Sequence, residues 1–151
     1  MRDKCILPFL ITERLEFFQL TQADLPELEI LLGDTEIMYA WEHGFTKIES
    51  QAWLNENLRR YSSDGYSYWA VRKKNDGSLI GVMGILKEVA EGKQYIGIGY
   101  ILNKKYWGQG YAGEGTEALC QYAFRKLQLQ TLTAQVRTNN FASQHIAEGL
   151  G

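Results

Sequence analysis

Residues 106–115 read YWGQGYAGEG and carry four glycines in ten positions. Gly108, Gly110 and Gly113 spell the pattern G-x-G-x-x-G, which is typical of dinucleotide-binding folds. The pattern is informative only where a strand leads into it and a helix leaves it in a suitable topology. The elements on either side therefore decide both the fold and the meaning of this stretch.

Composition places the chain among soluble single-domain proteins. It has 151 residues, 45% of them hydrophobic and 23% charged, with a formal net charge of −2. This charge gives no reason to expect nucleic acid or an anionic membrane as a partner. No apolar run approaches the ~20 residues of a membrane span. The apolar stretch near the start is interrupted by Pro8 and lacks a cleavage pattern, so no signal peptide is expected.

The cysteines predict neither a disulfide framework nor a metal site. Cys5 and Cys120 lie far apart in the sequence and have no metal-ligand spacing. Cys120 falls within a predicted amphipathic helix, which favours a small core residue over a nucleophile. We expect a cytoplasmic protein without a metal ion.

The part of the chain before residue 65 predicts one strand and two helices. Residues 14–20 are apolar enough for a strand. Thr21 is a suitable helix cap, and the leucines that follow recur at helical spacing until Gly33 ends the helix. A second helix is predicted over residues 49–61.

Three strands of an antiparallel meander come next. They are predicted at residues 66–73, 79–89 and 95–102, with turn residues between them. In the third strand Ile96, Ile98, Tyr100 and Leu102 share one face, while Gly97 and Gly99 leave the other face bare. Glycine within a strand often marks the close approach of another group, and we expect that group to be a ligand.

The final third of the chain predicts a βαβ unit. A helix starts at about Ala112, a strand covers residues 131–137, and a last helix begins at Phe141. The predicted order is β-α-α-β-β-β-α-β-α. It describes an α/β chain with a mixed, largely antiparallel sheet flanked by helices.

This order argues against a dinucleotide site. In dinucleotide-binding folds the glycines follow the first strand, and an acidic residue about 20 positions later binds the ribose. Here the glycines follow a meander, and the next strand ends in Gln135-Val136-Arg137-Thr138 without an acid. Glycines at a strand-to-helix junction still orient backbone amides toward one anion, at the positive end of a helix dipole. The alternative is a glycine-rich turn that packs tightly and binds no ligand.

Three motifs, in the right order on matching elements, resemble the GNAT superfamily of acetyl-CoA-dependent N-acetyltransferases. The frame Trp107–Ala112 resembles the family's pyrophosphate loop, although Trp107 stands where glutamine or arginine is usual. Residues 140–151 resemble its Asn-x-x-Ser…Leu-Gly helix. Thr12–Leu15, followed by Asp24, is similar to the branch of Rim-type ribosomal-protein N-terminal acetyltransferases. The resemblance implies a single domain over residues 1–151 that is short at its C-terminus and lacks the family's last two strands.

The resemblance also implies where acetyl-CoA binds. The pantetheine arm would pair with the backbone of the third meander strand, the amides of the glycine loop would bind the pyrophosphate, and two residues of the last helix would reach the end near the sulfur. The implied cofactor-binding residues are Tyr100, Ile101, Leu102, Trp107, Gly108, Gln109, Gly110, Tyr111, Ala112, Gly113, Asn140 and Ser143.

The catalytic pair that many relatives carry is absent. Ile98 occupies the position of the usual glutamate base and Ala147 that of the usual tyrosine acid. Ser143 is the nearest group that could hydrogen-bond the sulfur, though it could equally bond its own helix backbone. Glu42 and His43, in a loop that borders the acceptor site in relatives, are candidate bases. Glu88 and a water relay are further alternatives.

The sequence thus predicts an acetyltransferase that transfers acetyl from acetyl-CoA directly to a primary amine. The acceptor is a protein N-terminus or a small amine such as a polyamine or an amine antibiotic. A non-catalytic CoA-binding module or a truncated, inactive acetyltransferase is the alternative, and a dehydrogenase is a third. Without the last strands, the edge at residues 131–137 would be exposed and would favour a homodimer.

Overall fold

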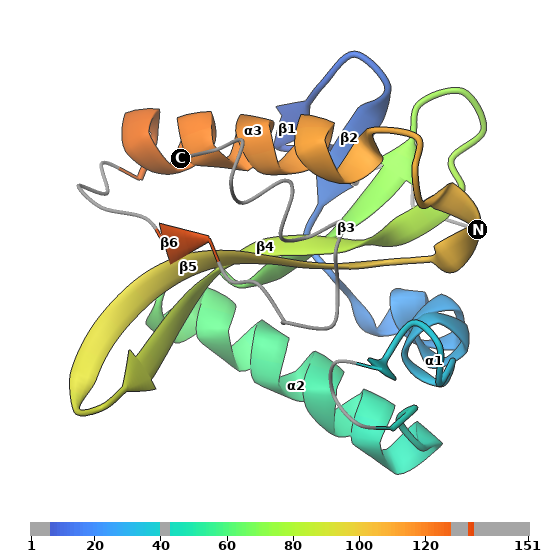
Figure 1. The fold of residues 1–151 in the computed structure, drawn as a ribbon, viewed down its shortest axis with the longest axis horizontal. Helices are drawn as coiled ribbons and strands as arrows, with labels where there is room; N and C mark the ends of the chain where they lie inside the picture. The colour runs from blue at the N-terminus through green and yellow to red at the C-terminus, as the bar shows by residue number, and fades with distance from the viewer. Residues whose placement is uncertain (1–6, 40–42, 128–132, 135–151) are drawn as a thin grey trace.

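The computed structural model describes residues 7–39, 43–127 and 133–134. It contains a single sheet with helices on both faces (Figure 1). Its elements are β1 (Leu10–Ile11), β2 (Leu15–Phe18), the 3-10 helix η1 (Gln22–Asp24), α1 (Leu25–Leu32), α2 (Lys47–Ser63), β3 (Tyr68–Lys73), β4 (Leu79–Ala90), β5 (Lys93–Leu102), the 3-10 helix η3 (Lys104–Tyr106), α3 (Tyr111–Arg125) and β6 (Thr133–Ala134).

The strands follow one another across the sheet in chain order, from β1 to β6. Neighbours from β1 to β5 pair antiparallel, and the longest ladder joins β4 to β5 from Gly81↔Leu102 to Ala90↔Lys93. β6 pairs parallel to β5 through Gly97↔Thr133 and Ile98↔Ala134. The predicted meander and the βαβ unit β5–α3–β6 are therefore confirmed. The predicted helix from Phe141 lies outside the described residues.

β1 was not predicted, and α2 begins two residues earlier than expected, at Lys47. Thr46 caps this helix, since its Oγ1 accepts from the Glu49 amide at 3.1 Å. The Glu49 carboxylate accepts from the Thr46 amide at 2.9 Å in return. This reciprocal pair is a capping box, and the T-x-x-E spelling of residues 46–49 is the signal that the prediction missed.

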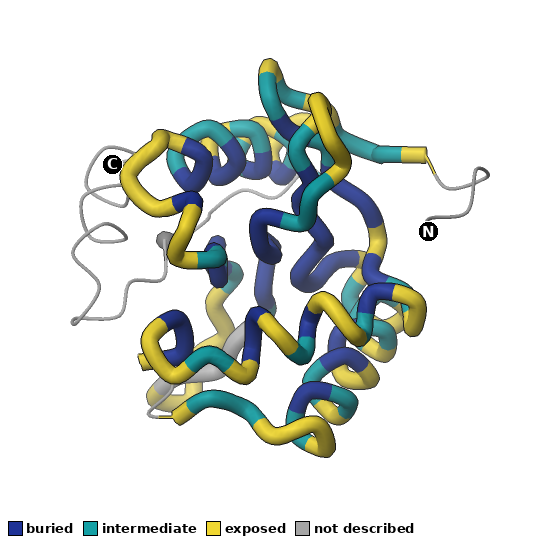
Figure 2. Tube along the Cα trace, turned by 90° about the vertical axis from the view of Figure 1, so that its right-hand side faces the viewer, coloured by how far each residue is buried: buried dark blue, intermediate teal, exposed yellow. Residues whose placement is uncertain are grey.

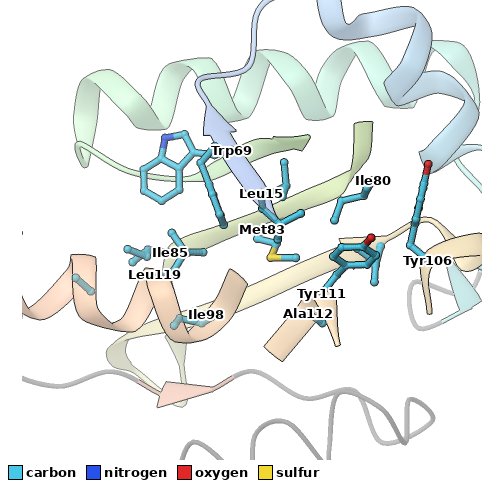
Figure 3. Packing of buried hydrophobic residues seen from close by; sticks show 14 of the residues in the cluster. Leu15, Trp69, Ile80, Met83, Ile85, Ile98, Tyr106, Tyr111, Ala112 and Leu119 are labelled. Atoms are coloured by element: carbon cyan, nitrogen blue, oxygen red, sulfur yellow. The ribbon is translucent and has the colours of Figure 1, made fainter. Parts of the chain in front are cut away.

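Two hydrophobic cores lie on opposite faces of the sheet. One lies between the sheet and α3, and Figure 3 shows Met83, Ile85 and Leu119 within it. The other lies beneath α1 and α2 and includes Leu28, Leu54 and Val82. The buried positions in Figure 2 run through the layer between the helices. Among the helices in the described part of the chain, none is long and apolar enough to cross a membrane.

The bare face of β5 at Gly99 is occupied by the protein itself. A Cβ on Gly99 would lie 3.0 Å from the Tyr68 hydroxyl and 3.2 Å from Leu86 Cδ1. The close approach predicted from this glycine is therefore confirmed, and the approaching groups are side chains of the protein, while the ligand on this face stays a prediction. The Tyr68 ring from β3 fills the space that a side chain at residue 99 would need.

A buried ion pair connects the C-terminal end of β3 to the start of α1. Arg72 and Asp24 are almost fully buried, with side chains 6% and 2% exposed, and Arg72 Nη2 lies 3.0 Å from Asp24 Oδ1. Glu27 binds the same guanidinium at 2.7 Å, but its own side chain is 46% exposed. Because water screens the buried Asp24 carboxylate least, we expect Asp24 to contribute more to stability than Glu27.

We expect Asp24→Asn to lower the free energy of unfolding by roughly 3 kcal/mol, since it removes a buried countercharge from Arg72. Glu27→Gln is the matched control, and it should cost only about 1 kcal/mol because water screens the half-exposed carboxylate. Urea unfolding of both variants measures the difference. Equal losses would contradict this division between the two carboxylates.

Candidate functional site

The glycine loop connects the end of β5 to the start of α3. Gly108 and Gly110 have φ values of +74° and +83°, in the left-handed region that glycine adopts at little cost. Gly110 is the N-cap of α3, and no side chain caps the helix there. The two glycines thus turn the chain sharply and leave the N-terminus of a 15-residue helix uncapped. Gly113 lies inside the first turn, as expected.

Backbone amides of this loop are the groups that could bind an anion. Within the described part of the chain, the amides of residues 108–113 donate to no protein acceptor. Trp107 was predicted to contribute its amide as well, but this amide donates to the Lys104 carbonyl at 3.1 Å. The run of available donors therefore starts at Gly108 and continues into the positive end of α3.

The side chains of the predicted loop residues hold the loop in place. The Trp107 indole Nε1 donates to the Leu102 carbonyl at 2.8 Å, and Gln109 Nε2 donates to the Lys105 carbonyl at 2.9 Å. Tyr111 and Ala112 are both buried, and Figure 3 shows their side chains in the core beside Met83. Their side chains thus serve packing, and only their amides are placed to contact a ligand.

The register of β5 separates the three predicted residues at its end. Asn103 donates its amide to the Ile80 carbonyl of β4 at 2.8 Å. Because backbone groups alternate along a strand, Ile101 also faces β4, while Tyr100 and Leu102 face the side of β6. Within the described residues β6 pairs with β5 only as far as Ile98. The backbone of Leu102, the last residue of β5, therefore faces the β6 side beyond this described pairing.

Arg14 and Glu114 form a cluster on this loop that the sequence reasoning missed. The Glu114 carboxylate accepts from the Thr12 hydroxyl, from the Arg14 amide at 2.9 Å and from Arg14 Nε at 2.7 Å. Arg14 Nη1 also donates to the Gln109 carbonyl at 3.1 Å, and its guanidinium lies 4.1 Å above the Tyr111 ring. A glutamate in the first turn after the loop was the available signal, but its partner lies 100 residues away.

Glu114 is held as a carboxylate by these contacts. Partial burial acts to raise its pKa, but hydrogen bonds from the Thr12 hydroxyl and from the amide and side chain of Arg14 outweigh it. The pKa of Glu114 is therefore lower than its ordinary value. The side chain is 18% exposed, so solvent screens this cluster only in part.

The loop between α1 and α2 contains His43, the candidate base that lies within the described residues. His43 Nε2 lies 2.9 Å from Glu49 Oε2, and the His43 side chain is 57% exposed. The start of the same loop is joined to η3, because Lys104 Nζ lies 3.2 Å from Asp34 and 2.9 Å from Glu36. Glu42, Asn140 and Ser143 lie outside the described residues, and so does the side chain of Glu88.

Comparison with known proteins identifies the family. The sequence model of the acetyltransferase (GNAT) domain family matches residues 14–151. The uncharacterised protein YkkB of Bacillus subtilis is 29% identical over 143 residues, which cover 94% of this chain and 83% of YkkB.

Solved structures share the fold. An acetyltransferase from Agrobacterium tumefaciens superposes with a TM-score of 0.83 at 25% identity, covering 100% of this chain and 86% of the other. RimL, a ribosomal L7/L12 α-N-protein acetyltransferase solved in complex with coenzyme A, superposes with a TM-score of 0.76 at 21% identity, covering 95% and 81%.

The low pKa of Glu114 makes its stabilising effect depend on pH. Because the folded-state pKa is depressed, the contribution is complete above the unfolded value of about 4.3 and is lost as pH falls through the folded value. Glu114→Gln should therefore lower the free energy of unfolding by roughly 2 kcal/mol at pH 7, and by less at pH 3, which lies below the unfolded pKa. Urea unfolding of both proteins at the two pH values measures this. A difference independent of pH would show that the carboxylate charge is not involved.

Proposed function

Because the chain belongs to the GNAT acetyltransferase domain family, we propose that it transfers an acetyl group from acetyl-CoA to a primary amine by direct attack. It is an acetyltransferase by family, and the donor, the acceptor and the roles of individual residues are the proposal. The observation that carries it is the run of amides from Gly108 to Gly113, at the start of α3, that donate to no acceptor among the described residues.

These amides suit a diphosphate group. An anion at a helix N-terminus gains both hydrogen bonds from the free amides and the field of the helix dipole. The left-handed Gly108 and Gly110 turn the backbone so that no Cβ shields the loop, and a Cβ on Gly108 would meet no atom within 4 Å. The loop residues therefore fit the diphosphate of CoA, as the resemblance of Trp107–Ala112 implies. The coenzyme A bound to RimL is consistent with this assignment.

The end of β5 suits the pantetheine arm, which carries amide groups. We propose that the arm runs along the backbone of Tyr100 and Leu102, which faces the β6 side of β5. The Leu102 carbonyl accepts from the Trp107 indole, so its amide is the group proposed to hold the arm or the thioester oxygen. The backbone of Ile101 faces β4, which limits it to a supporting role.

Acetyl-CoA would supply the acetyl thioester that the amine attacks, with the CoA thiol as leaving group. The chain must then accept the proton of the amine, because amines of pKa 8–10 are mostly protonated at pH 7. His43 is a proposed base with an exposed ring, oriented by Glu49. Glu42 and Glu88 are alternatives, and Ser143 and Asn140 are proposed to contact the sulfur end.

The acceptor is proposed to be a protein N-terminus or a small amine. The segment Thr12–Leu15 supports the first choice through its resemblance to Rim-type enzymes. One observation favours the non-catalytic alternative. Ile98, at the position where relatives carry a glutamate, is only 4% exposed and packs in the core beneath α3. The predicted homodimer edge is described only at Thr133–Ala134, so the homodimer stays a prediction.

The experiment that tests the proposal combines binding with turnover. We expect CoA to raise the unfolding temperature of the protein, because a ligand that binds only the folded state stabilises it. We also expect free thiol to be released from acetyl-CoA when a panel of N-terminal peptides, polyamines and amine antibiotics is added. Stabilisation without thiol release from any amine would favour the non-catalytic module. Stabilisation by a nicotinamide dinucleotide in place of CoA would contradict both.

Gly110→Ala tests the loop itself. A left-handed φ costs a residue with a Cβ about 1–2 kcal/mol, which favours a rearranged loop, and we expect the Kd for CoA to rise more than tenfold. Gly92→Ala is the matched control, since Gly92 also has a positive φ, of +76°, but lies at the β4–β5 turn, where a Cβ would meet no atom within 4 Å. Both variants should lose similar stability, and only Gly110→Ala should lose affinity. Unchanged CoA affinity in Gly110→Ala would exclude the loop as the diphosphate site.

A further inference from the structure

Arg14 joins the second strand to three successive parts of the glycine loop. Its Nη1 donates to the Gln109 carbonyl, and its Nε donates to the Glu114 carboxylate. The guanidinium also lies over the Tyr111 ring. Its own backbone is held on both sides, because its amide donates to Glu114 and its carbonyl accepts from the Lys74 amide at 2.9 Å. Arg14 is thus a fixed point against which the loop is positioned.

The contact with Gln109 determines the direction of the next amide. The peptide bond between Gln109 and Gly110 is planar and trans, so its C=O and N–H point in opposite directions. Because Arg14 holds the Gln109 carbonyl, it also fixes where the Gly110 amide points, away from Arg14. This amide belongs to the run of donors at the start of α3. Glycine on both sides of Gln109 would otherwise leave this peptide free to rotate.

The contact with Glu114 has an electrostatic effect on the same site. A carboxylate in the first turn of α3 would repel an anion bound at that end of the helix. Arg14 lies 2.7 Å from this carboxylate and neutralises it. Arg14 Nη2 also lies 3.4 Å from the position that a Cβ of Gly110 would take, so the positive charge stands at the N-cap itself.

From these contacts we propose that Arg14 is a positioning residue for the donor diphosphate. It acts by aiming the Gly110 amide and by neutralising Glu114. The inference rests on the proposed function, since it assumes that the loop binds the diphosphate of CoA. It assigns a role to the arginine of Thr12–Leu15, which the resemblance of this segment to Rim-type enzymes does not.

A donor without phosphates separates this role from a general effect on folding. We expect Arg14→Gln to raise the Kd for CoA, measured by calorimetry, and the KM for acetyl-CoA by at least tenfold. Turnover of S-acetylpantetheine, which has the thioester and the arm but no diphosphate, should change less than twofold. Arg14→Lys keeps the charge but loses the fork that binds two acceptors, so its Kd should fall between those of wild type and Arg14→Gln.

The Glu114 carboxylate provides a second, independent readout. In Arg14→Gln this carboxylate is left without its cation, and the double variant Arg14→Gln with Glu114→Gln should recover part of the lost CoA affinity. Arg59→Gln is the matched control, because Arg59 pairs with Glu56 on the exposed face of α2, and it should leave CoA affinity unchanged.

The outcomes distinguish this inference from the proposed function. If wild type does not bind CoA, the proposed function fails and the role of Arg14 fails with it. If wild type binds CoA and Arg14→Gln binds it equally well, the role of Arg14 alone is wrong. Equal losses with acetyl-CoA and S-acetylpantetheine would show that Arg14 supports the fold and not the diphosphate site. If Arg14→Gln does not fold, Arg14→Lys decides between the same outcomes.

Discussion

The proposed site depends on the hydrogen bonds that the Glu114 carboxylate accepts. The carboxylate receives hydrogen bonds from Thr12 and from both the backbone and side chain of Arg14, and so it ties the start of the sheet to the start of α3. A helix N-terminus that is to bind an anion must stay uncapped, which leaves it without the usual local stabilisation. In this chain the stabilisation comes from outside the cap position, through a residue of the first turn. The amides of residues 108–113 are thereby kept available.

The sheet places this helix end where a ligand can reach it. β5 leads into the loop, α3 crosses one face of the sheet, and β6 returns parallel beside β5 (Figure 1). Ligands of α/β proteins commonly bind outside the carboxyl ends of strands, and the loop follows the carboxyl end of β5. The alternation of backbone groups along β5 then presents Tyr100 and Leu102 to the same region. The proposed diphosphate site at the loop and the proposed path of the pantetheine arm along the strand therefore belong to one strand–loop–helix junction.

The sequence alone predicted the described helices α1, α2 and α3 and the strands β2 to β6, because these depend on local signals, but it did not predict β1. Hydrophobic periodicity predicted α3, and turn residues predicted the meander that the registers confirm. The contacts that local signals do not report were missed. Gly99 indicated a close approach, but nothing near it in the sequence indicated that Tyr68 fills the space. Likewise, Arg14 and Glu114 are both ordinary surface residue types, and only the fold reveals that they meet across 100 residues.

The stretch YWGQGYAGEG shows why a spelling does not determine a site. In dinucleotide-binding folds the third glycine of G-x-G-x-x-G allows the helix to pack closely on the strand. Here the third glycine, Gly113, has no atom within 4 Å of a Cβ built on it, so it serves no such packing. Gly115 does, because its Cβ would lie 2.3 Å from Met83 Sδ on β4. The glycine that allows close packing of α3 on the sheet is therefore Gly115, two residues after the third glycine of the pattern. Gly108 and Gly110, both with a positive φ, shape the loop, and the match to the dinucleotide pattern arises from glycines with different physical roles.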